Sequence, residues 1–155
     1  MQYKFATPTG NSGFQFRSQV IDEKTYRVGG YQADIDGNAQ YDGGFYDEAG
    51  IAGKRGIMAN RGDKTTWDSE NKRRNEPLGK SKAELAKVIK KGDWNAMILT
   101  AKGNTMSIQI NGQLMGELID NSPKAVKEGL IAIQMHAGYT MTIQVKDIKI
   151  KLLKS

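Results

Sequence analysis

Apolar and polar residues alternate along short stretches of this chain, which predicts β-strands. The alternation is clearest over 31–36 and 130–136. The polar positions are Gln32, Asp34 and Asp36 in the first stretch, and Gln134 and His136 in the second. Because successive side chains of a strand point to opposite faces of the sheet, the polar residues of each stretch should share one face. A sheet face carrying amide, carboxylate and imidazole groups predicts a polar pocket.

Other strand-like stretches recur along the chain and are separated by turn residues. They cover 14–17, 26–36, 43–48, 56–60, 95–101, 105–110, 113–119 and 141–153. Asn111-Gly112 lies between two of them and is typical of a tight hairpin. Many short strands at regular spacing, without an internal repeat or a linker, predict an all-β antiparallel sandwich that forms one domain over 1–155.

One stretch has helical spacing. Ser81 and Glu84 fit a capping box, in which the serine caps the helix and the glutamate reaches back. Apolar residues follow at positions 85, 88 and 89, and Gly92 ends the run. We therefore expect a single short helix near 81–91. The preceding stretch, 61–80, is polar throughout and predicts a long surface loop.

Composition limits the size of the protein and the kinds of site that it can contain. The chain has 155 residues, 38% of them hydrophobic, which suits one domain with a modest core. It contains no cysteine, so disulfides and thiolate metal sites are excluded. No stretch is long and apolar enough to span a membrane, and the first residues carry no signal peptide. These residues alone leave the cellular compartment undetermined.

The chain is basic, with 23 Lys and Arg against 17 Asp and Glu and a net charge of +6. Much of the excess lies in 72–74, 80–91 and 146–154. Such a surface can attract nucleic acid or an anionic polysaccharide. Because no nucleic-acid motif and no interleaved stacking aromatics accompany these charges, we expect a solvated surface rather than a nucleic-acid partner.

Several short segments match one family together, in order and over nearly the whole chain. They are Gly10-Asn11-Ser12-Gly13 with Phe16-Arg17, Gly30-Tyr31-Gln32-Ala33-Asp34-Ile35, Gly44-Phe45-Tyr46-Asp47-Glu48, Gly92-Asp93-Trp94-Asn95, Ile110-Asn111-Gly112, Gly129-Leu130-Ile131-Ala132-Ile133-Gln134-Met135-His136 and Val145-Lys146-Asp147-Ile148. In these the chain resembles the 3-keto-disaccharide hydrolase domain family, long catalogued as a domain of unknown function. The resemblance implies a concanavalin-like jelly roll and a saccharide substrate. It also implies a periplasmic or secreted location.

Two departures from the family pattern stand out. Family members carry further strands before the Asn-Ser-Gly motif, so the resemblance implies that the N-terminal strands are missing here. We then expect a missing N-terminal segment or a partner chain to cover an open sheet edge. Many family members also have glutamate where Gln32 stands and glutamine where Asp34 stands. The Tyr-Gln-Ala-Asp pattern places the chain in a subgroup.

The candidate catalytic residues are His136, Asp34 and Glu48. A lone histidine after an apolar strand is ordinarily structural, but the resemblance puts the Gln-x-His pair at a sugar cleft. A carboxylate in mid-strand, such as Asp34, is disfavoured unless it is exposed or paired. Asp36 has a simpler explanation, because Gly37 follows it and an aspartate there can bond its own turn.

The candidate substrate-binding residues are Asn11, Arg17, Gln32, Tyr46, Gln134 and Trp67. Arg17 should lie opposite the phenylalanines of 14–17, where it could hold a sugar hydroxyl or a carboxylate. Trp67 lies in the polar stretch 61–80 and could stack on a sugar. Asn11 could instead serve only as a turn residue. Asp47 and Glu48 should point to opposite faces, so at most one of them enters a common cleft.

The resemblance implies action on 3-keto-glycosides, in which the ketone acidifies the proton on C2. A base removes that proton and the glycosidic oxygen leaves by β-elimination, with water added later. We expect His136 or Asp34 to be the base and Glu48 to protonate the leaving group. Arg17 or a bound cation would stabilise the enolate. The sequence requires no cofactor, although one imidazole and nearby carboxylates could hold a divalent cation.

Two other functions remain open from the sequence. A lectin-like fold can serve as a carbohydrate-binding module without catalysis, because fold does not fix function. It would hold an unmodified glycan and leave a 3-keto-glycoside intact. Alternatively, the basic surface could bind an anionic polysaccharide or nucleic acid, with an affinity that falls steeply with salt.

Overall fold

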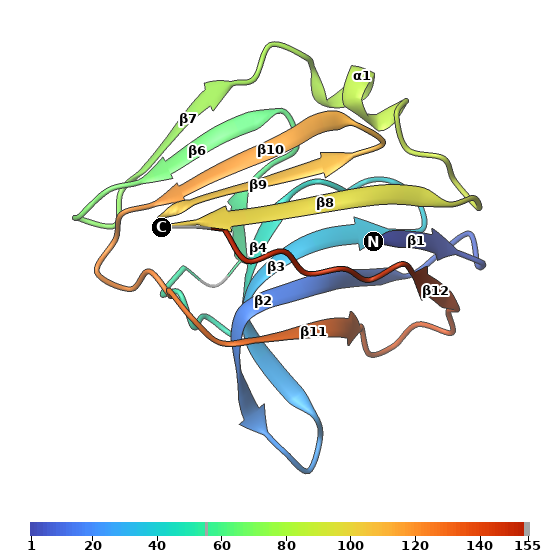
Figure 1. The fold of residues 1–155 in the computed structure, drawn as a ribbon, viewed down its shortest axis with the longest axis horizontal. Coiled ribbons are helices and arrows are strands. Elements are labelled where there is room, and N and C mark those ends of the chain that lie inside the picture. Colours follow the sequence, from blue (N-terminus) through green and yellow to red (C-terminus); the bar gives the residue numbers. More distant parts are fainter. Residues whose placement is uncertain (55, 154–155) are drawn as a thin grey trace.

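Two β-sheets pack face to face in the computed structural model, which describes residues 1–54 and 56–153 (Figure 1). The seven-stranded sheet has the spatial order β12 (Ile143–Lys146), β1 (Gln2–Phe5), β8 (Asn95–Lys102), β9 (Thr105–Ile110), β10 (Gln113–Asp120), β6 (Asp63–Trp67) and β7 (Arg73–Pro77). The five-stranded sheet has the order β11 (Leu130–Met135), β2 (Asn11–Asp22), β3 (Arg27–Asp36), β4 (Phe45–Glu48) and β5 (Gly56–Ala59). The predicted all-β sandwich is confirmed.

Among the described strands, neighbours run antiparallel except in the parallel pair β10 and β6, in which Glu117 lies opposite Lys64. The predicted hairpin at Asn111-Gly112 joins β9 to β10. The long β2–β3 hairpin projects away from the body of the sandwich (Figure 1). Strands distant in sequence meet at β1, which lies between β12 and β8.

The core between the sheets consists of aromatic, aliphatic and methionine side chains. The largest fully buried side chains are Tyr3, Tyr31, Phe45, Ile35, Met58, Leu85, Met97, Met106, Ile108, Ile110, Met115 and Leu118. The Phe16 ring stacks against Tyr31 and meets Phe45 edge-on. Apolar side chains of alternate strand positions therefore fill the sandwich, and the polar positions between them face outward.

Two expectations about 61–91 need correction. The α-helix, α1 (Lys82–Ala86), is much shorter than 81–91, although its predicted capping box is present. After Ala86 the chain tightens into i→i+3 hydrogen bonds, such as Ile89 N–H to Ala86 O, so the helix does not continue. The polar stretch 61–80 is not a loop but contains the β6–β7 hairpin, whose edge strand β7 leaves most of its side chains in water.

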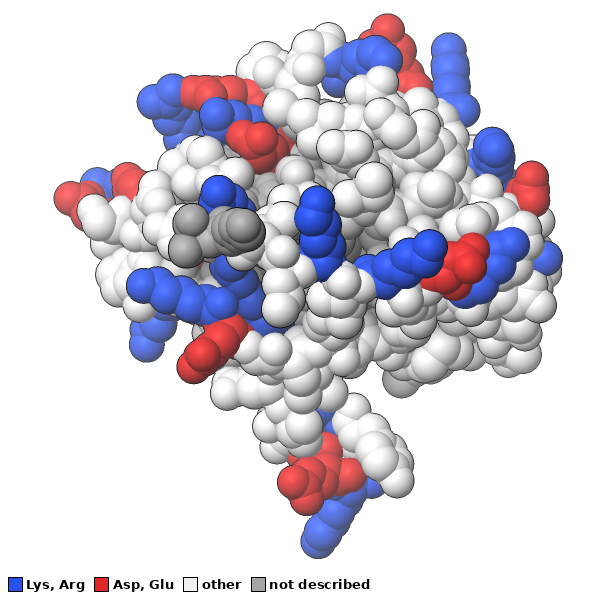
Figure 2. Space-filling view, viewed as in Figure 1, with Lys and Arg blue, Asp and Glu red and all other residues white. Residues whose placement is uncertain are grey.

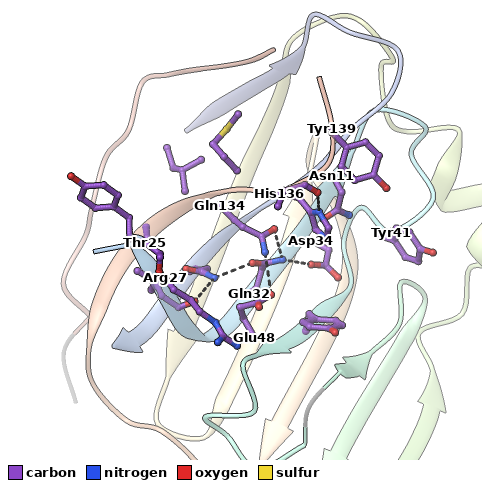
Figure 3. Close-up of a pocket in the computed structure, with 18 of the residues that line it drawn as sticks. Asn11, Thr25, Arg27, Gln32, Asp34, Tyr41, Glu48, Gln134, His136 and Tyr139 are labelled. Carbon is purple, nitrogen blue, oxygen red and sulfur yellow. Dashed lines mark hydrogen bonds between the residues drawn. The ribbon is translucent and has the colours of Figure 1, made fainter. Parts of the chain in front are cut away.

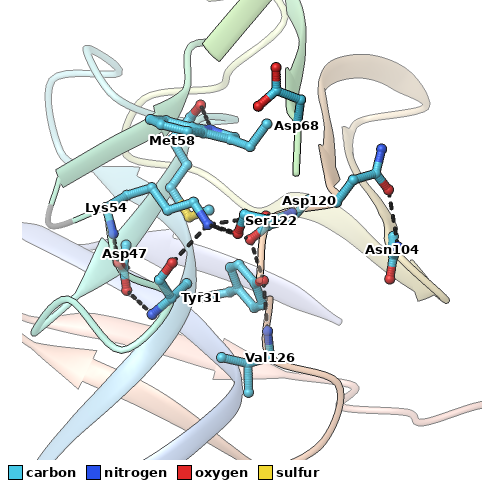
Figure 4. Close-up of polar contacts among 12 residues, drawn as sticks. Tyr31, Asp47, Lys54, Met58, Asp68, Asn104, Asp120, Ser122 and Val126 are labelled. Carbon is cyan, nitrogen blue, oxygen red and sulfur yellow. Dashed lines mark hydrogen bonds and ion pairs between the residues drawn. The ribbon is translucent and has the colours of Figure 1, made fainter. Parts of the chain in front are cut away.

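A buried polar network joins the two sheets (Figure 4). Tyr31 on β3 donates its hydroxyl hydrogen to Asp120 on β10, at 2.7 Å. The Lys54 ammonium lies 2.9 Å from the same carboxylate and also reaches Ser122. Both charged side chains are almost fully buried. Because removing one partner would leave a buried charge uncompensated, this network should matter for stability.

Charged side chains of both signs lie side by side on one face of the molecule. On the face seen in Figure 2, Lys and Arg are interspersed with Asp and Glu around the rim. This pattern suits the solvated surface expected from the sequence. Among the described residues, no helix has the length and apolar character needed to cross a membrane.

Candidate functional site

A pocket of about 1110 Å³ opens on the outer face of the five-stranded sheet (Figure 3). Four neighbouring strands supply its polar floor: Gln15 on β2, Gln32 and Asp34 on β3, Glu48 on β4 and Gln134 on β11. The strand register brings them together, since Gln15 pairs with Gln32 and the Gly13 position pairs with both Asp34 and Gln134. The polar residues predicted to share a face in 31–36 and 130–136 therefore line one pocket, with the exception of Asp36.

Hydrogen bonds link the two carboxylates of the floor through two glutamine amides. The Gln32 amide donates to Asp34 Oδ1 at 2.8 Å and to Gln134 Oε1 at 3.2 Å. Gln134 in turn donates to Glu48 Oε2 at 3.1 Å. Gln15 donates to Gln32 Oε1 at 3.2 Å, which fixes the orientation of that amide. Asp34 and Glu48 are thus connected and positioned by a continuous amide chain.

Gly13 makes this arrangement possible. A Cβ atom at this position would lie 2.3 Å from Gln32 Cγ, far closer than two carbon atoms can approach. The Gln32 side chain therefore lies directly over the glycine backbone on its way to Asp34 and Gln134. The Asn11-Ser12-Gly13 segment therefore begins β2 and, at Gly13, leaves room for the Gln32 side chain.

Asp34 is the most perturbed acid of the pocket. Its side chain is 7% exposed, and this burial raises its pKa to about 7, with smaller contributions from the charges of Asp36, Asp42 and Glu48. The hydrogen bond from Gln32 opposes the rise but does not cancel it. Within the part of the chain that is described, Oδ2 of Asp34 receives no hydrogen bond. A carboxyl group with this pKa can take up and release a proton near neutral pH.

His136 lies at the rim, just after β11, and is exposed. Its Nδ1 is 2.7 Å from the Ala137 carbonyl oxygen. Because a carbonyl can only accept, this contact assigns the proton of the neutral ring to Nδ1 and leaves Nε2 as the acceptor. The Tyr139 ring packs edge-on at 5.3 Å. The imidazole is therefore held by its own turn with Nε2 available.

The rest of the rim combines aromatic and hydrogen-bonding side chains. Asn11 and Tyr46, two of the candidate substrate-binding residues, line the pocket. Rim residues that the sequence reasoning missed are Thr25, Tyr26, Arg27, Tyr41 and Tyr139. Sequence reasoning also missed Gln15 on the floor, which alternates with Phe14 and Phe16. Tyrosine faces and fixed polar groups around a pocket are features of saccharide sites.

The structure contradicts the expectation that Arg17 joins this face. A bulge between Phe16 and Gln19 interrupts the alternation, and Arg17 takes a left-handed backbone conformation with φ 48°. Its guanidinium turns away and donates to the carbonyl oxygens of Gly103 and Val126. Among the described residues, Arg27 is a cation that does line the pocket.

Trp67 and Asp36 also lie outside the pocket. Trp67 is on β6, packs against the core and donates its indole N–H to Met58 O, so it is no free stacking platform. Trp67 is not exposed as expected, because 61–80 forms a hairpin that packs against the sandwich and is not a surface loop. The Asp36 carboxylate accepts the N–H groups of Asn38 and Gln40, which confirms the turn role considered for it.

The pocket does not present a ready metal site. Among the residues described, no three His, Asp or Glu side chains converge in a way that could hold a metal ion. Asp34, Glu48 and His136 are nonetheless lining residues of one pocket. What they can do as a set is move protons over a bound polar molecule.

Comparison with known proteins is consistent with a saccharide site. No curated protein matches the chain. The sequence model of the 3-keto-alpha-glucoside-1,2-lyase-like domain matches residues 1–151, nearly the whole chain and every strand of both sheets. The chain therefore belongs to the family of 3-keto-alpha-glucoside-1,2-lyase-like domains.

Proposed function

We propose that the protein cleaves 3-keto-glycosides by β-elimination. The ketone at C3 acidifies the C2 proton, and a base removes it to give an enolate. The enolate electrons re-form the ketone while a C1–C2 double bond forms and the C1–oxygen bond breaks. The leaving alcohol takes a proton, and later addition of water gives net hydrolysis. This reaction needs a base near neutral pKa and a separate proton donor in one pocket.

Asp34 is the residue that we assign to C2 proton abstraction. The observation that carries this proposal is its burial, which brings its pKa to about 7, while Oδ2 receives no hydrogen bond from the described residues. An ionised Asp34 at neutral pH is a stronger base than an ordinary carboxylate, because its pKa is higher. Gln32 and Gln134 hold it in place.

The proton for the leaving oxygen comes from His136 or Glu48. The His136 Nε2 faces no protein donor among the described residues, and a protonated imidazole would serve as the acid. Glu48 was the sequence-based choice, but its Oε2 already accepts a hydrogen bond from the Gln134 amide. Arg27 replaces Arg17 as the cation that supports the enolate oxygen.

The test is turnover of a 3-keto-disaccharide by Asp34→Asn, His136→Ala and Glu48→Gln, with Asp22→Asn as a control outside the pocket. We expect Asp34→Asn to lose at least about a hundredfold in kcat, the usual scale for a removed general base. A 3-keto-glycoside with a nitrophenolate leaving group should restore the variant that lacks the acid, because that group leaves without a proton. Full turnover by both Asp34→Asn and His136→Ala would refute the assignment.

A carbohydrate-binding role without catalysis is the second candidate. The exposed rings of Tyr26, Tyr41 and Tyr139 around the pocket favour it, since such rings stack on sugars without needing a tuned pKa. Calorimetry with an unmodified glycan, followed by incubation with a 3-keto-disaccharide, separates the two. A binder holds the first and leaves the second intact.

A further inference from the structure

A buried glutamine on β2, Gln15, anchors the amide chain of the pocket. Its side chain is 2% exposed. Its amide nitrogen makes two hydrogen bonds, one to Val28 O at 3.3 Å and one to Gln32 Oε1 at 3.2 Å. On the other side, its neighbour on β11 is Ala132, whose side chain has no polar group. Gln15 therefore ties the Gln32 amide to the backbone of β3.

This tie fixes the direction of the amides that follow. A backbone carbonyl can only accept a hydrogen bond, so Gln15 must turn its NH₂ group toward Val28 O. The same NH₂ group meets Gln32, which must present its oxygen there and its own NH₂ group on the other side. That NH₂ group donates to Asp34 Oδ1 at 2.8 Å and to Gln134 Oε1 at 3.2 Å (Figure 3). Reversing Gln32 would set two oxygens or two N–H groups against each other.

The direction of Gln32 affects the two protonation states of Asp34 unequally. The ionised carboxylate can only accept, and the hydrogen bond from Gln32 lowers the Asp34 pKa against the larger effect of burial. A protonated Asp34 could donate to the Gln32 oxygen if the amide turned over, but Gln15 already occupies that oxygen. Gln15 therefore favours the ionised form of Asp34, in which a carboxylate acts as a base.

We propose that Gln15 is a positioning residue of the reaction, which keeps the Gln32 NH₂ group turned toward Asp34 so that this carboxylate can accept the C2 proton. Gln15 acts through Gln32, because its amide nitrogen is already engaged by Val28 O and Gln32 Oε1. The inference rests on the proposed function and adds a residue of β2 to its site.

The variant that tests this role is Gln15→Met. Methionine has a similar length and no charge, so the substitution removes the donor without changing any charge near Asp34. The charged and titratable groups around the carboxyl group therefore stay as they are: Asp36, Asp42, Glu48, Tyr46, Tyr41, Arg27 and His136. The Gln32 amide becomes free to turn over when Asp34 is protonated, so the Asp34 pKa should rise by about one unit.

Ser18→Ala is the matched control. Ser18 is also on β2 and 2% exposed, and it donates a hydrogen bond to Phe16 O. It does not line the pocket and does not contact the amide chain. Its loss should affect stability but leave the Asp34 pKa unchanged.

The first measurement is a carbon-13 NMR titration of the Asp34 carboxyl group, identified by its absence from Asp34→Asn. Gln15→Met should raise the midpoint by about one pH unit. In a Gln32→Met background the same substitution should cause no further shift, because no amide remains to be held. An unchanged midpoint in Gln15→Met, or an equal shift in the Gln32→Met background, would overturn the proposal. Gln15→Leu repeats the titration and replaces Gln15→Met if that variant does not fold.

The second measurement is the pH profile of kcat/KM on a 3-keto-disaccharide. Its midpoint should rise with the NMR midpoint, so that Gln15→Met is about tenfold slower at low pH and approaches the natural rate at high pH. A loss of rate that is the same at every pH would overturn the proposal, since it would reflect a structural role only. If the titration moves and the rate profile does not, Asp34 is not the base and the proposed function fails at this residue, whereas the orientation of Gln32 by Gln15 stands.

Discussion

Replacing Asp34 by asparagine should make the protein more stable at alkaline pH while it removes activity. Asparagine keeps an oxygen that can accept the Gln32 N–H, but it never carries the buried negative charge. In the natural protein that charge is unfavourable, because the folded-state pKa is about 7 and the ordinary value is 3.8. The folded state therefore binds the Asp34 proton more tightly than the unfolded state does.

The sign of the pH dependence follows from this difference. The contribution of Asp34 to stability is fully present below the ordinary pKa of 3.8 and is lost as the pH rises through the folded-state value of about 7. Between about pH 5 and about pH 8 the loss amounts to about 3 kcal/mol for this one group. Asp42, which is also buried with a pKa raised to about 7, adds a similar slope, but both proteins share it.

The assay is urea unfolding of the natural protein and Asp34→Asn at several pH values. The variant's advantage in free energy of unfolding should grow by about 3 kcal/mol from about pH 5 to about pH 8. Asp22→Asn is the matched control, because hydrogen bonds from Thr25 and Lys24 lower the pKa of that exposed acid. Its substitution should never stabilise at high pH. A constant difference between the natural protein and Asp34→Asn across this range would refute the argument that Asp34 is buried at a cost.

Three further predictions concern the same framework. Lys54→Met should lower the free energy of unfolding by about 3–5 kcal/mol in urea titrations, because it leaves the Asp120 carboxylate as a lone buried charge. Adding Asp120→Asn removes that charge and should recover part of the lost stability. No recovery would contradict the electrostatic role of the network. Gly13→Ala should displace the Gln32 side chain and lower the free energy of unfolding by about 1–3 kcal/mol in thermal unfolding. It should also reduce kcat/KM on a 3-keto-disaccharide. Unchanged values would show that the Gln32 amide is not confined by Gly13. The kcat/KM of the natural protein should rise with pH through about 7, because the base must be ionised, and a profile falling over that range would exclude Asp34 as the base.

Strand alternation predicted the polar face well because the strands concerned are regular. Gln32 and Asp34 lie in an uninterrupted part of β3, and Gln134 faces them from β11 in the expected orientation. Where the backbone departs from regular pairing, the same reasoning failed. Arg17 lies within the bulge in β2, where one residue of extra length is enough to turn it to another surface.

Other features depend on contacts between distant parts of the chain. The raised pKa of Asp34 comes from burial by neighbouring strands, which no local pattern encodes. Trp67 looked exposed because its neighbours are polar, yet its hairpin packs it against the core. The rim residues Arg27, Tyr41 and Tyr139 meet at the pocket only through the sheet topology.

The most direct test follows the C2 hydrogen of the substrate. A 3-keto-disaccharide carrying deuterium at C2 should react more slowly than the ordinary compound, and its deuterium should appear in water as the product forms. With Asp34→Asn the release of deuterium should stop, while His136→Ala or Glu48→Gln should still allow it. Cleavage that proceeds without an isotope effect and leaves the deuterium on C2 of the product would contradict the elimination mechanism and the role of Asp34.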